Sequence, residues 1–410
     1  MIALSYDIKK IRSDFPILRE KIYGDKPLIY LDNGATTQKP GIVIDYIDQF
    51  HSRFNSSIHR GMHFLSEKAT EDYESARKTV QAFIGAEKSE EIIFTSGTTG
   101  SINGLAFSFG ERYIRAGDEI IITEMEHHAN IVPWQMLCER KGATLKVIPF
   151  DDNGELILED FEKLISERTR LVSVVYVSNS LGTVNPVKKI IDTAHKYDIP
   201  VLIDGAQAIQ HTSVNVKDLD CDFFVFSGHK IYGPTGIGVL YGKEKWLNEI
   251  PPFQGGGDMV DVVTFEKTTY NVLPFKFEAG TTNYIGAIAM ARALDYVSGI
   301  GLENIIKYES ELLANATRKF AAMEGITLYG KARKKASVIS FLIDGVHPYD
   351  AGMVIDKMGI AVRTGTHCTQ PVMQHFKIDG TIRVSLALYN TKEEIDILCD
   401  TISRVKQMFR

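Results

Sequence analysis

The sequence has few cysteines and no long apolar run. Its 410 residues include only Cys138, Cys221, Cys368 and Cys399, with no C-x-x-C pair among them. That spacing argues against a disulfide framework and against a zinc knuckle. No apolar run approaches the roughly 20 residues needed to span a bilayer, and the first residues lack the basic start and apolar core of a secretory signal. We therefore expect a cytoplasmic protein with reduced thiols and no membrane partner.

The sequence also lacks an excess of positive charge. Lysine and arginine number 46 against 52 aspartates and glutamates, which gives a formal net charge of -6. This balance argues against a nucleic-acid partner and gives no reason to expect attraction to anionic membranes. Hydrophobic residues make up 44% and charged residues 24%, as in ordinary globular proteins, and the length is enough for two domains.

Short apolar segments alternate with polar loops and helical stretches from about residue 91 to residue 240. Strands are predicted at 91–94, 119–123, 171–177, 201–203 and 223–226. Such β-branched runs are typical of strands buried on both faces of a mostly parallel sheet. Ligand sites in these sheets lie beyond the carboxyl ends of the strands. The prediction is an α/β fold, with a mostly parallel central sheet flanked by helices.

The C-terminal third has a different pattern. Amphipathic helices are predicted at 287–297 and 301–323, and a last helix from Lys392, with strands at 337–343, 361–363 and 381–385. We predict a large domain over residues 26–295 and a smaller C-terminal α+β domain over 296–410. Residues 1–25 are expected to pack against the smaller domain.

A lysine and an aspartate follow two neighbouring predicted strands. Lys230 ends the segment Ser-Gly-His-Lys, and Asp204 begins Asp-Gly-Ala-Gln. A partly buried lysine can form a Schiff base, and a strand-end carboxylate can keep a pyridinium nitrogen protonated. A lone lysine at this place is more often a surface residue. The two segments together, about one βα unit apart, indicate a pyridoxal phosphate (PLP) site.

The turn after the first of these strands is rich in hydroxyl groups. Ser96-Gly-Thr-Thr-Gly100 precedes a helical stretch, so Thr98, Thr99 and the backbone amides can hold a phosphate. An ordinary polar turn is the alternative. The spacing of a nucleotide P-loop is absent.

Two adjacent histidines follow the strand at 119–123. His127 is placed to stack on a flat cofactor ring or to move protons. A metal site shared with His128 is the rival idea. Adjacent histidine side chains normally diverge and no further ligands lie nearby in the sequence, so no metal is expected.

The segment Arg363-Thr-Gly-Thr-His-Cys368 follows a C-terminal strand. Free cysteines are usually core residues, but Cys368 has polar neighbours, and His367 beside it is expected to favour the thiolate. Arg383 has the fork geometry that holds a substrate carboxylate, although a surface ion pair is the commoner role for such a residue.

Taken together, these segments resemble a known family over nearly the whole chain. It is the class-V aminotransferase branch of the fold-type I PLP enzymes, and within it the group II cysteine desulfurases of the SUF iron–sulfur assembly pathway (SufS-like). The resemblance is carried by segments that begin at Tyr30, His59, Met125, Asp204, Phe226, Phe277 and Arg363.

The resemblance implies a role for each candidate residue. Lys230 would carry the cofactor, Cys368 would receive the sulfur of L-cysteine, and the persulfide would pass to an acceptor protein of the SufE or SufU type. The remaining implied contacts are Asp204 with the ring nitrogen, Gln207 with the ring oxygen, His127 stacked on the ring, Thr98, Thr99, Ser227 and His229 with the phosphate, Thr281 with the phosphate of the partner in a homodimer, and Asn179, Arg363 and Arg383 with the substrate carboxylate.

The chain departs from the family pattern at four positions. Ser96 and Gly100 stand where arginine and glutamate are common, and Thr366 and Thr369 flank His367 and Cys368 where histidine and alanine are common. These departures concern the tuning of the thiol and the docking of an acceptor. They leave Lys230 in place.

Three other functions remain open at this point. A selenocysteine lyase or cysteine-sulfinate desulfinase would use the same cofactor without an essential thiol. An aminotransferase or epimerase would need Lys230 but not Cys368. A non-catalytic assembly scaffold would need neither residue.

Overall fold

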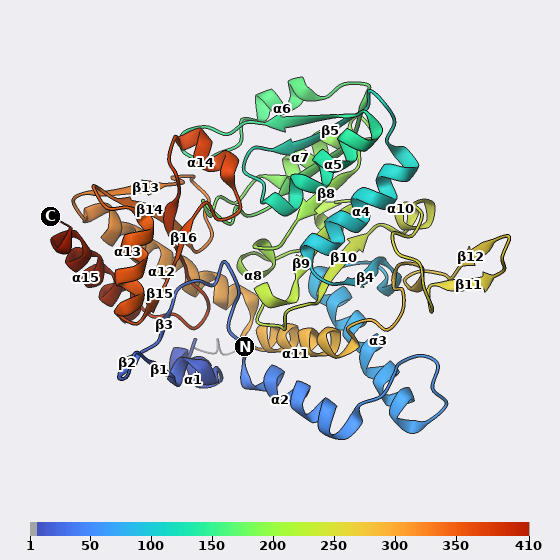
Figure 1. Ribbon diagram of the computed structural model, residues 1–410, viewed down its shortest axis with the longest axis horizontal. Coiled ribbons are helices and arrows are strands. Elements are labelled where there is room, and N and C mark those ends of the chain that lie inside the picture. The colour runs from blue at the N-terminus through green and yellow to red at the C-terminus, as the bar shows by residue number, and fades with distance from the viewer. Residues whose placement is uncertain (1–5, 410) are drawn as a thin grey trace.

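A computed structural model describes residues 6–409 of the chain. Its centre is a seven-stranded sheet with the order β4-β10-β9-β8-β7-β5-β6 (Figure 1). All neighbours pair in parallel except β10, which is antiparallel to both β4 and β9. The strands are β4 (Ile92–Thr95), β5 (Glu119–Thr123), β6 (Thr144–Ile148), β7 (Thr169–Val175), β8 (Val201–Asp204), β9 (Phe223–Ser227) and β10 (Gly238–Gly242). The predicted mostly parallel sheet is therefore confirmed.

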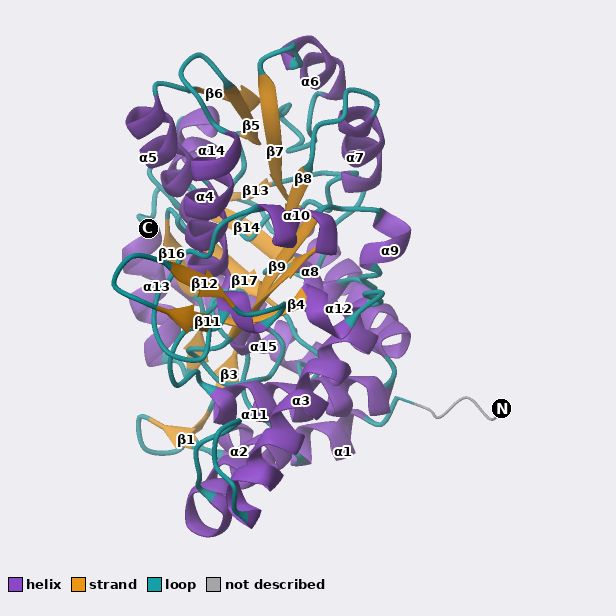
Figure 2. Ribbon diagram, turned by 90° about the vertical axis from the view of Figure 1, so that its right-hand side faces the viewer, coloured by secondary structure: helices purple, strands orange, loops and turns teal. Residues whose placement is uncertain are grey.

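Both faces of this sheet are buried, because side chains alternate along each strand. In β9, Phe223 and Val225 join one hydrophobic core, and Phe224 and Phe226 join the other. Helices α4 (Thr98–Tyr113), α5 (Val132–Lys141) and α10 (Glu244–Glu249) contribute to the first core. Helices α3 (Phe64–Ile84), α7 (Val187–His195) and α11 (Tyr284–Ile300) contribute to the second. The figures show this layering from two sides (Figures 1 and 2).

A second, antiparallel sheet has the order β13-β14-β17-β16. It has its own core against the helices of the C-terminal third. Its elements are α12 (Leu302–Ala322), β13 (Ile326–Tyr329), β14 (Val338–Ile343), α13 (Pro348–Lys357), β16 (Arg363–Gly365), α14 (Gln370–Phe376), β17 (Thr381–Ser385) and α15 (Lys392–Met408). The boundaries proposed for the two domains, 26–295 and 296–410, stay a prediction.

The described N-terminal residues contact both parts of the chain. Arg12 donates to Glu394 of α15 at 2.8 Å, whereas Phe15 packs on Tyr232 and Tyr296 of the larger core. The short elements here are α1 (Ile8–Ser13), a 3-10 turn (Pro16–Arg19), β1 (Lys21–Ile22), β2 (Lys26–Pro27), β3 (Ile29–Tyr30), which pairs in parallel with β15 (Ile360–Ala361), and α2 (Gly41–Gln49), which leads into a π-helical turn (Phe50–Phe54).

Several further elements fall outside the sequence prediction. A hairpin of β11 (Val260–Val263) and β12 (Thr268–Tyr270) projects from the body of the molecule (Figure 1). The other short helical segments are α6 (Leu158–Leu164), α8 (Ala208–His211), α9 (Val216–Leu219) and 3-10 turns at Ser89–Glu91, His128–Asn130, Gly228–Lys230 and Phe275–Phe277. Within residues 6–409, no single helix is long and apolar enough to cross a bilayer; α11 and α12 pass that test only as a pair, and they are bent by 76°.

A buried ion pair ties α3 to the strand that leads into the site. Arg77 bonds both carboxylate oxygens of Glu278, at 2.7 and 2.9 Å, and donates to the carbonyl of Ile92 in β4 at 2.7 Å. Glu278 also accepts from the amide of Phe94 at 2.8 Å and from the hydroxyl of Tyr73 at 2.7 Å. Because both charges are buried and their hydrogen bonds converge on β4, this pair fixes the strand that ends at the turn 96–100.

We expect Arg77→Leu to lower the free energy of unfolding by about 3–5 kcal/mol, because it leaves the Glu278 charge buried without a partner. Urea unfolding followed by circular dichroism measures this loss. The control is Arg404→Leu on the exposed side of α15, which should change the value by less than about 0.5 kcal/mol. An Arg77→Leu protein as stable as the control variant would contradict the prediction.

Candidate active site

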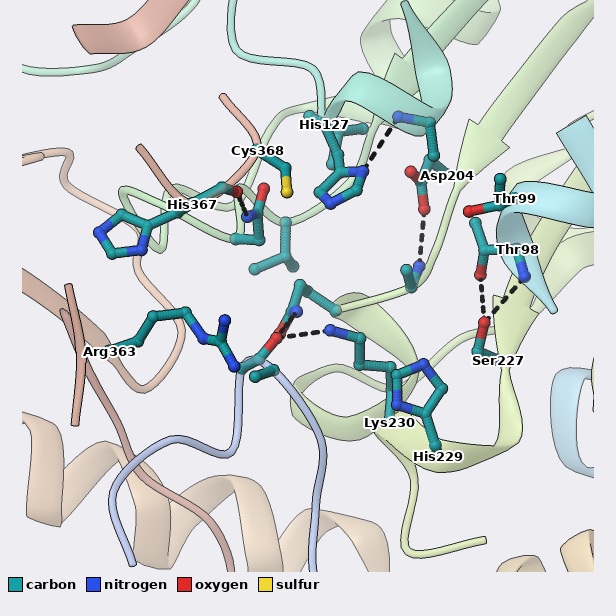
Figure 3. A pocket seen from close by; sticks show the side chains of 18 of the residues that line it. Thr98, Thr99, His127, Asp204, Ser227, His229, Lys230, Arg363, His367 and Cys368 are labelled. Atoms are coloured by element: carbon teal, nitrogen blue, oxygen red, sulfur yellow. Dashed lines mark hydrogen bonds between the residues drawn. The ribbon is translucent and has the colours of Figure 1, made fainter. Parts of the chain in front are cut away.

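A cavity of about 320 Å³ lies beyond the carboxyl ends of the parallel strands, between the large sheet and the smaller one. It receives residues from the loops after β4, β5, β7, β8 and β9 and from the segment 363–383 (Figure 3). Of the sequence-predicted site residues, it brings together Thr98, Thr99, His127, Asn179, Asp204, Gln207, Ser227, His229, Lys230, Arg363, Cys368 and Arg383. Among these predicted residues, the cavity brings together positions as far apart as Thr98 and Arg383 (383 − 98 = 285).

Lys230 ends the 3-10 turn that follows β9, and its amine points into the cavity (Figure 3). The Nζ atom donates to the carbonyl of Gly34 at 2.5 Å. Burial, followed by the charge of Arg383, lowers the pKa of Lys230 to about 7. A neutral amine is the nucleophilic form, so Lys230 is partly in that form at neutral pH.

Asp204, the last residue of β8, is buried at the cavity floor. Burial raises the pKa of its carboxyl to about 6, against the opposing effects of the Ala206 amide and Lys230. Its Oδ1 accepts from the Ala206 amide at 2.9 Å. The carboxyl is mostly ionised at pH 7 and sits close enough to Lys230 to interact with its charge.

The start of α4 forms a polar cradle at one end of the cavity. The Ser227 Oγ accepts from the Thr98 amide at 2.8 Å and lies 2.9 Å from the Thr98 hydroxyl. Gly97 precedes the helix at φ +134°, and a Cβ there would lie 3.2 Å from the Ser227 Oγ, so this position requires glycine. No acidic residue occupies the first turn of α4. A helix start with free donors attracts a phosphate.

His127 lies above the cavity with its neutral ring fixed. Its Nδ1 accepts from the Ala129 amide at 3.0 Å, which leaves the hydrogen on Nε2. Burial, then the charge of Lys230, lowers the pKa of His127 to about 4. Its uncharged ring is therefore available to stack on a flat ligand at neutral pH.

Cys368 is exposed at the mouth of the cavity, and its sulfur points inward, toward the space between His127 and Lys230 (Figure 3). The neighbouring imidazole points away. His367 Nε2 lies 2.9 Å from the Thr381 hydroxyl, and burial lowers the pKa of His367 to about 3. His367 is therefore uncharged and supplies no positive charge to the thiol. The sequence-based expectation that it favours the thiolate is wrong, because its side chain is buried against β17.

The two arginines share a carboxylate that the sequence analysis did not single out. Asp32 accepts from Arg363 through both oxygens, at 3.1 Å (Oδ1) and 2.9 Å (Oδ2), and from Arg383 at 3.1 Å. Arg383 is buried, also donates to the backbone carbonyl of Asn179 at 3.0 Å, and leaves its Nε without a partner among the described residues. Asn179 gives one N–H to the carbonyl of His367 at 2.7 Å.

Thr281 is the predicted residue that does not line this cavity. It is exposed and borders a second cavity, whose lining also includes Ser96 and Gly100. It therefore lies outside the cavity that contains Lys230.

The family of the chain is shown by its similarity to known proteins. The sequence model of aminotransferase class-V matches residues 29–398. The chain belongs to the class-V aminotransferase family. Dependence on pyridoxal phosphate characterises this family, which confirms the predicted cofactor.

Similar members of this family are cysteine desulfurases. The chain is 52% identical to a probable cysteine desulfurase of Mycolicibacterium paratuberculosis over 98% of its own length, and it spans 58% of that relative's length. It is 48% identical to a cysteine desulfurase of Escherichia coli over 99% of its length and the whole of that relative. The crystal structure of the E. coli cysteine desulfurase CsdA in an S-sulfonic acid form is 34% identical, with a TM-score of 0.92 over 98% of this chain and 99% of that one. The predicted α/β fold of the fold-type I PLP enzymes is therefore confirmed for this chain. The narrower SufS-like assignment stays a prediction.

The cavity has the polar groups that the cofactor needs. Gln207 Oε1 and His229 Nδ1 are buried in its wall and have no hydrogen-bond partner within residues 6–409. Buried polar atoms are normally paired, so these atoms require a polar ligand or water. Together with the amine of Lys230 and the donors around Ser227, they fit a flat, phosphate-bearing aldehyde.

We expect the amine of Lys230 to titrate near pH 7 in the cofactor-free protein. Dilute acetic anhydride acylates only the neutral amine. The extent of acylation at each lysine, measured by mass spectrometry at a series of pH values, therefore gives the midpoint of its titration. Lys163 is the control, because Asp160 raises its pKa and keeps it protonated through pH 9. Arg383→Gln should move the Lys230 midpoint upward, since the loss of a nearby positive charge favours the ammonium form. A wild-type midpoint near 10 would contradict the prediction.

Proposed function

We propose that this chain is a PLP-dependent cysteine desulfurase, which takes the sulfur of L-cysteine as a persulfide on Cys368 and leaves L-alanine. The observation that carries the proposal is the convergence of Lys230, Asp204 and Cys368 on one cavity. A lysine and an aspartate are what a PLP enzyme needs. The inward-pointing thiol is what distinguishes sulfur transfer from other PLP chemistry.

When bound, the cofactor supplies an electron sink that weakens the bonds at the α-carbon of an amino acid. Lys230 holds the cofactor and then, as a free amine, removes the α-proton. Its lowered pKa, about 7, suits this task because the neutral form is populated at neutral pH. The hydrogen bond to the Gly34 carbonyl keeps the amine at the cavity wall.

The other residues orient the cofactor and set its charge. Asp204 would pair with the ring nitrogen as a carboxylate, the neutral His127 ring would stack on the cofactor, and Gln207 would bond the ring oxygen. Thr98, Thr99 and Ser227 at the start of α4 would hold the phosphate together with His229. These roles are supported by the burial of Asp204 and by the lack of an acidic residue in the first turn of α4.

The substrate carboxylate binds at the arginine pair. Arg383 has a free Nε in the buried wall, Arg363 stands beside it, and Asn179 retains a second amide hydrogen. Asp32 already balances part of this positive charge, which keeps both guanidinium groups in place when no substrate is bound.

Sulfur transfer is a displacement at the substrate sulfur. The Cys368 thiolate attacks that atom, a sulfur–sulfur bond forms and the carbon–sulfur bond breaks. The bonding pair stays on the carbon, which takes up a proton as L-alanine forms. An exposed thiol at the cavity mouth can both reach inward and present the persulfide outward.

We further propose a cytoplasmic homodimer that supplies sulfur for iron–sulfur cluster assembly. Thr281 would bind the phosphate at the partner's site, which its exposed position outside the cavity supports. An acceptor protein of the SufE or SufU type would collect the sulfur from Cys368. The four unpaired cysteines support a reducing compartment.

We expect Cys368→Ala to lose at least about 100-fold in sulfide and alanine release from L-cysteine, because the sulfur has no acceptor. The change in the cofactor's visible absorbance on cysteine binding should remain. Cys399→Ala, a half-buried thiol in α15, is the matched control and should keep its activity.

Three outcomes would redirect the assignment. Activity that survives Cys368→Ala indicates a selenocysteine lyase or sulfinate desulfinase if those substrates react faster. It indicates an aminotransferase or epimerase if the amino group is moved or the α-carbon inverted. A protein that stays colourless with added cofactor indicates a scaffold.

A further inference from the structure

The adjacent histidines His127 and His128 point to different parts of the site. Their ring planes differ by 49° with centroids 6.2 Å apart, and only His127 lines the cavity. The proposed reaction gives His128 no task. Its contacts lie with the segment that carries Cys368.

His128 bonds the backbone on both sides of Thr369. Its own amide donates to the Cys368 carbonyl at 2.8 Å, and its Nε2 accepts from the Gln370 amide at 3.3 Å. These contacts join the loop after β5 to a segment more than 230 residues later. His128 thus links the large sheet to the Cys368 turn. We call its two bonds, to the Cys368 carbonyl and from the Gln370 amide, the clasp.

Within residues 6–409, the Gln370 amide has no other acceptor. Gln370 is the first residue of α14, and the first amides of a helix lack partners within the helix. The side chain of Thr369 does not cap this helix, because its hydroxyl donates to the Thr366 carbonyl at 2.9 Å. Pro371, the next residue, has no amide hydrogen. The imidazole of His128 therefore acts as the N-terminal cap of α14.

The turn that this clasp holds is strained. His367 and Cys368 both have left-handed backbone angles, with φ of +53° and +56°. Such a backbone conformation is unfavourable for a non-glycine residue and persists only where its surroundings enforce it. Asn179 bonds the His367 carbonyl at 2.7 Å and His128 bonds the next one, so consecutive carbonyls of the turn are fixed from the large sheet.

We propose that His128 is a positioning residue for the Cys368 thiol: by capping α14 and binding the Cys368 carbonyl, it holds the turn that aims the sulfur into the cavity. The role rests on the proposed desulfurase function. The two histidines then have different roles: His127 stacks on the cofactor ring, and His128 positions the Cys368 thiol.

The test separates binding of the substrate from attack on its sulfur. In His128→Leu, the backbone bond to Cys368 remains but the cap on Gln370 is lost. We expect the absorbance change on L-cysteine binding, and its concentration dependence, to stay within about twofold of wild type. Persulfide formation on Cys368 in a single turnover, measured by alkylation and mass spectrometry, should slow about 10- to 100-fold, as for a nucleophile displaced by a fraction of an ångström to one ångström. His128→Gln, which retains an acceptor, should recover most of the rate.

A second variant removes the same bond from the other side. Gln370→Pro removes the amide hydrogen that Gln370 donates to His128 Nε2, and the first position of a helix tolerates proline. If the two variants remove one shared interaction, their effects on the persulfide rate will not add in the double mutant. Additive effects, or a wild-type rate in His128→Leu, overturn the proposal. His51→Leu, at an exposed histidine, is the control and should leave the rate unchanged.

Amide hydrogen exchange provides a readout that needs no substrate. Exchange in the peptide 364–376 should be faster in His128→Leu than in wild type and in His51→Leu, with or without cofactor. Equal exchange in all three proteins overturns the clasp. If exchange in 364–376 is slower in wild type than in His128→Leu, but wild type releases no sulfide from cysteine, the proposed function is refuted. The structural role of His128 is then still supported.

Discussion

The site depends on one carboxylate between two guanidinium groups. Asp32 bonds Arg363 and Arg383, which lie on adjacent strands of the smaller sheet, and its own backbone bridges to Ser385. Without Asp32, two like charges would stand side by side, one of them buried. The segment that carries Asp32 also brings the Gly34 carbonyl to the amine of Lys230. One short segment near the N-terminus, residues 32–34, therefore contacts both the arginine pair and the amine of Lys230.

Burial, more than any single neighbour, sets the proton positions in the cavity. It lowers the pKa values of Lys230, His127 and His229 and raises that of Asp204. The result at neutral pH is a largely uncharged set of bases around one carboxylate. Lys230, with its pKa near 7, can therefore exchange a proton at neutral pH, the two histidines stay uncharged, and the carboxylate can pair with a cationic ring.

The sequence predicted the parts of the fold that are governed by local pattern. The apolar runs 120–122 and 223–226 form the centres of β5 and β9, and polar residues that meet in the cavity follow their carboxyl ends. β6 was not predicted, because its exposed and buried residues do not form such a run. β10 is a short strand bounded by glycines, and its antiparallel place beside β4 depends on tertiary pairing.

The candidate site was predictable where chemistry and spacing coincide, as at Lys230. It was not predictable where a contact spans the whole chain. Asp32 has no local signal that separates it from other aspartates, since its arginine partners lie more than 330 residues away. The direction of the His367 side chain is set by Thr381 on another strand, so its closeness to Cys368 in sequence misled the interpretation.

The exposure of Cys368 at the cavity mouth also has a chemical cost. An exposed thiol is open to small oxidants. Peroxide carries such a sulfur through sulfenic and sulfinic to sulfonic acid, and the last step has no return. Under the proposed function, the same exposure that lets sulfur leave would make the lifetime of the active thiol depend on how constantly substrate or acceptor covers it.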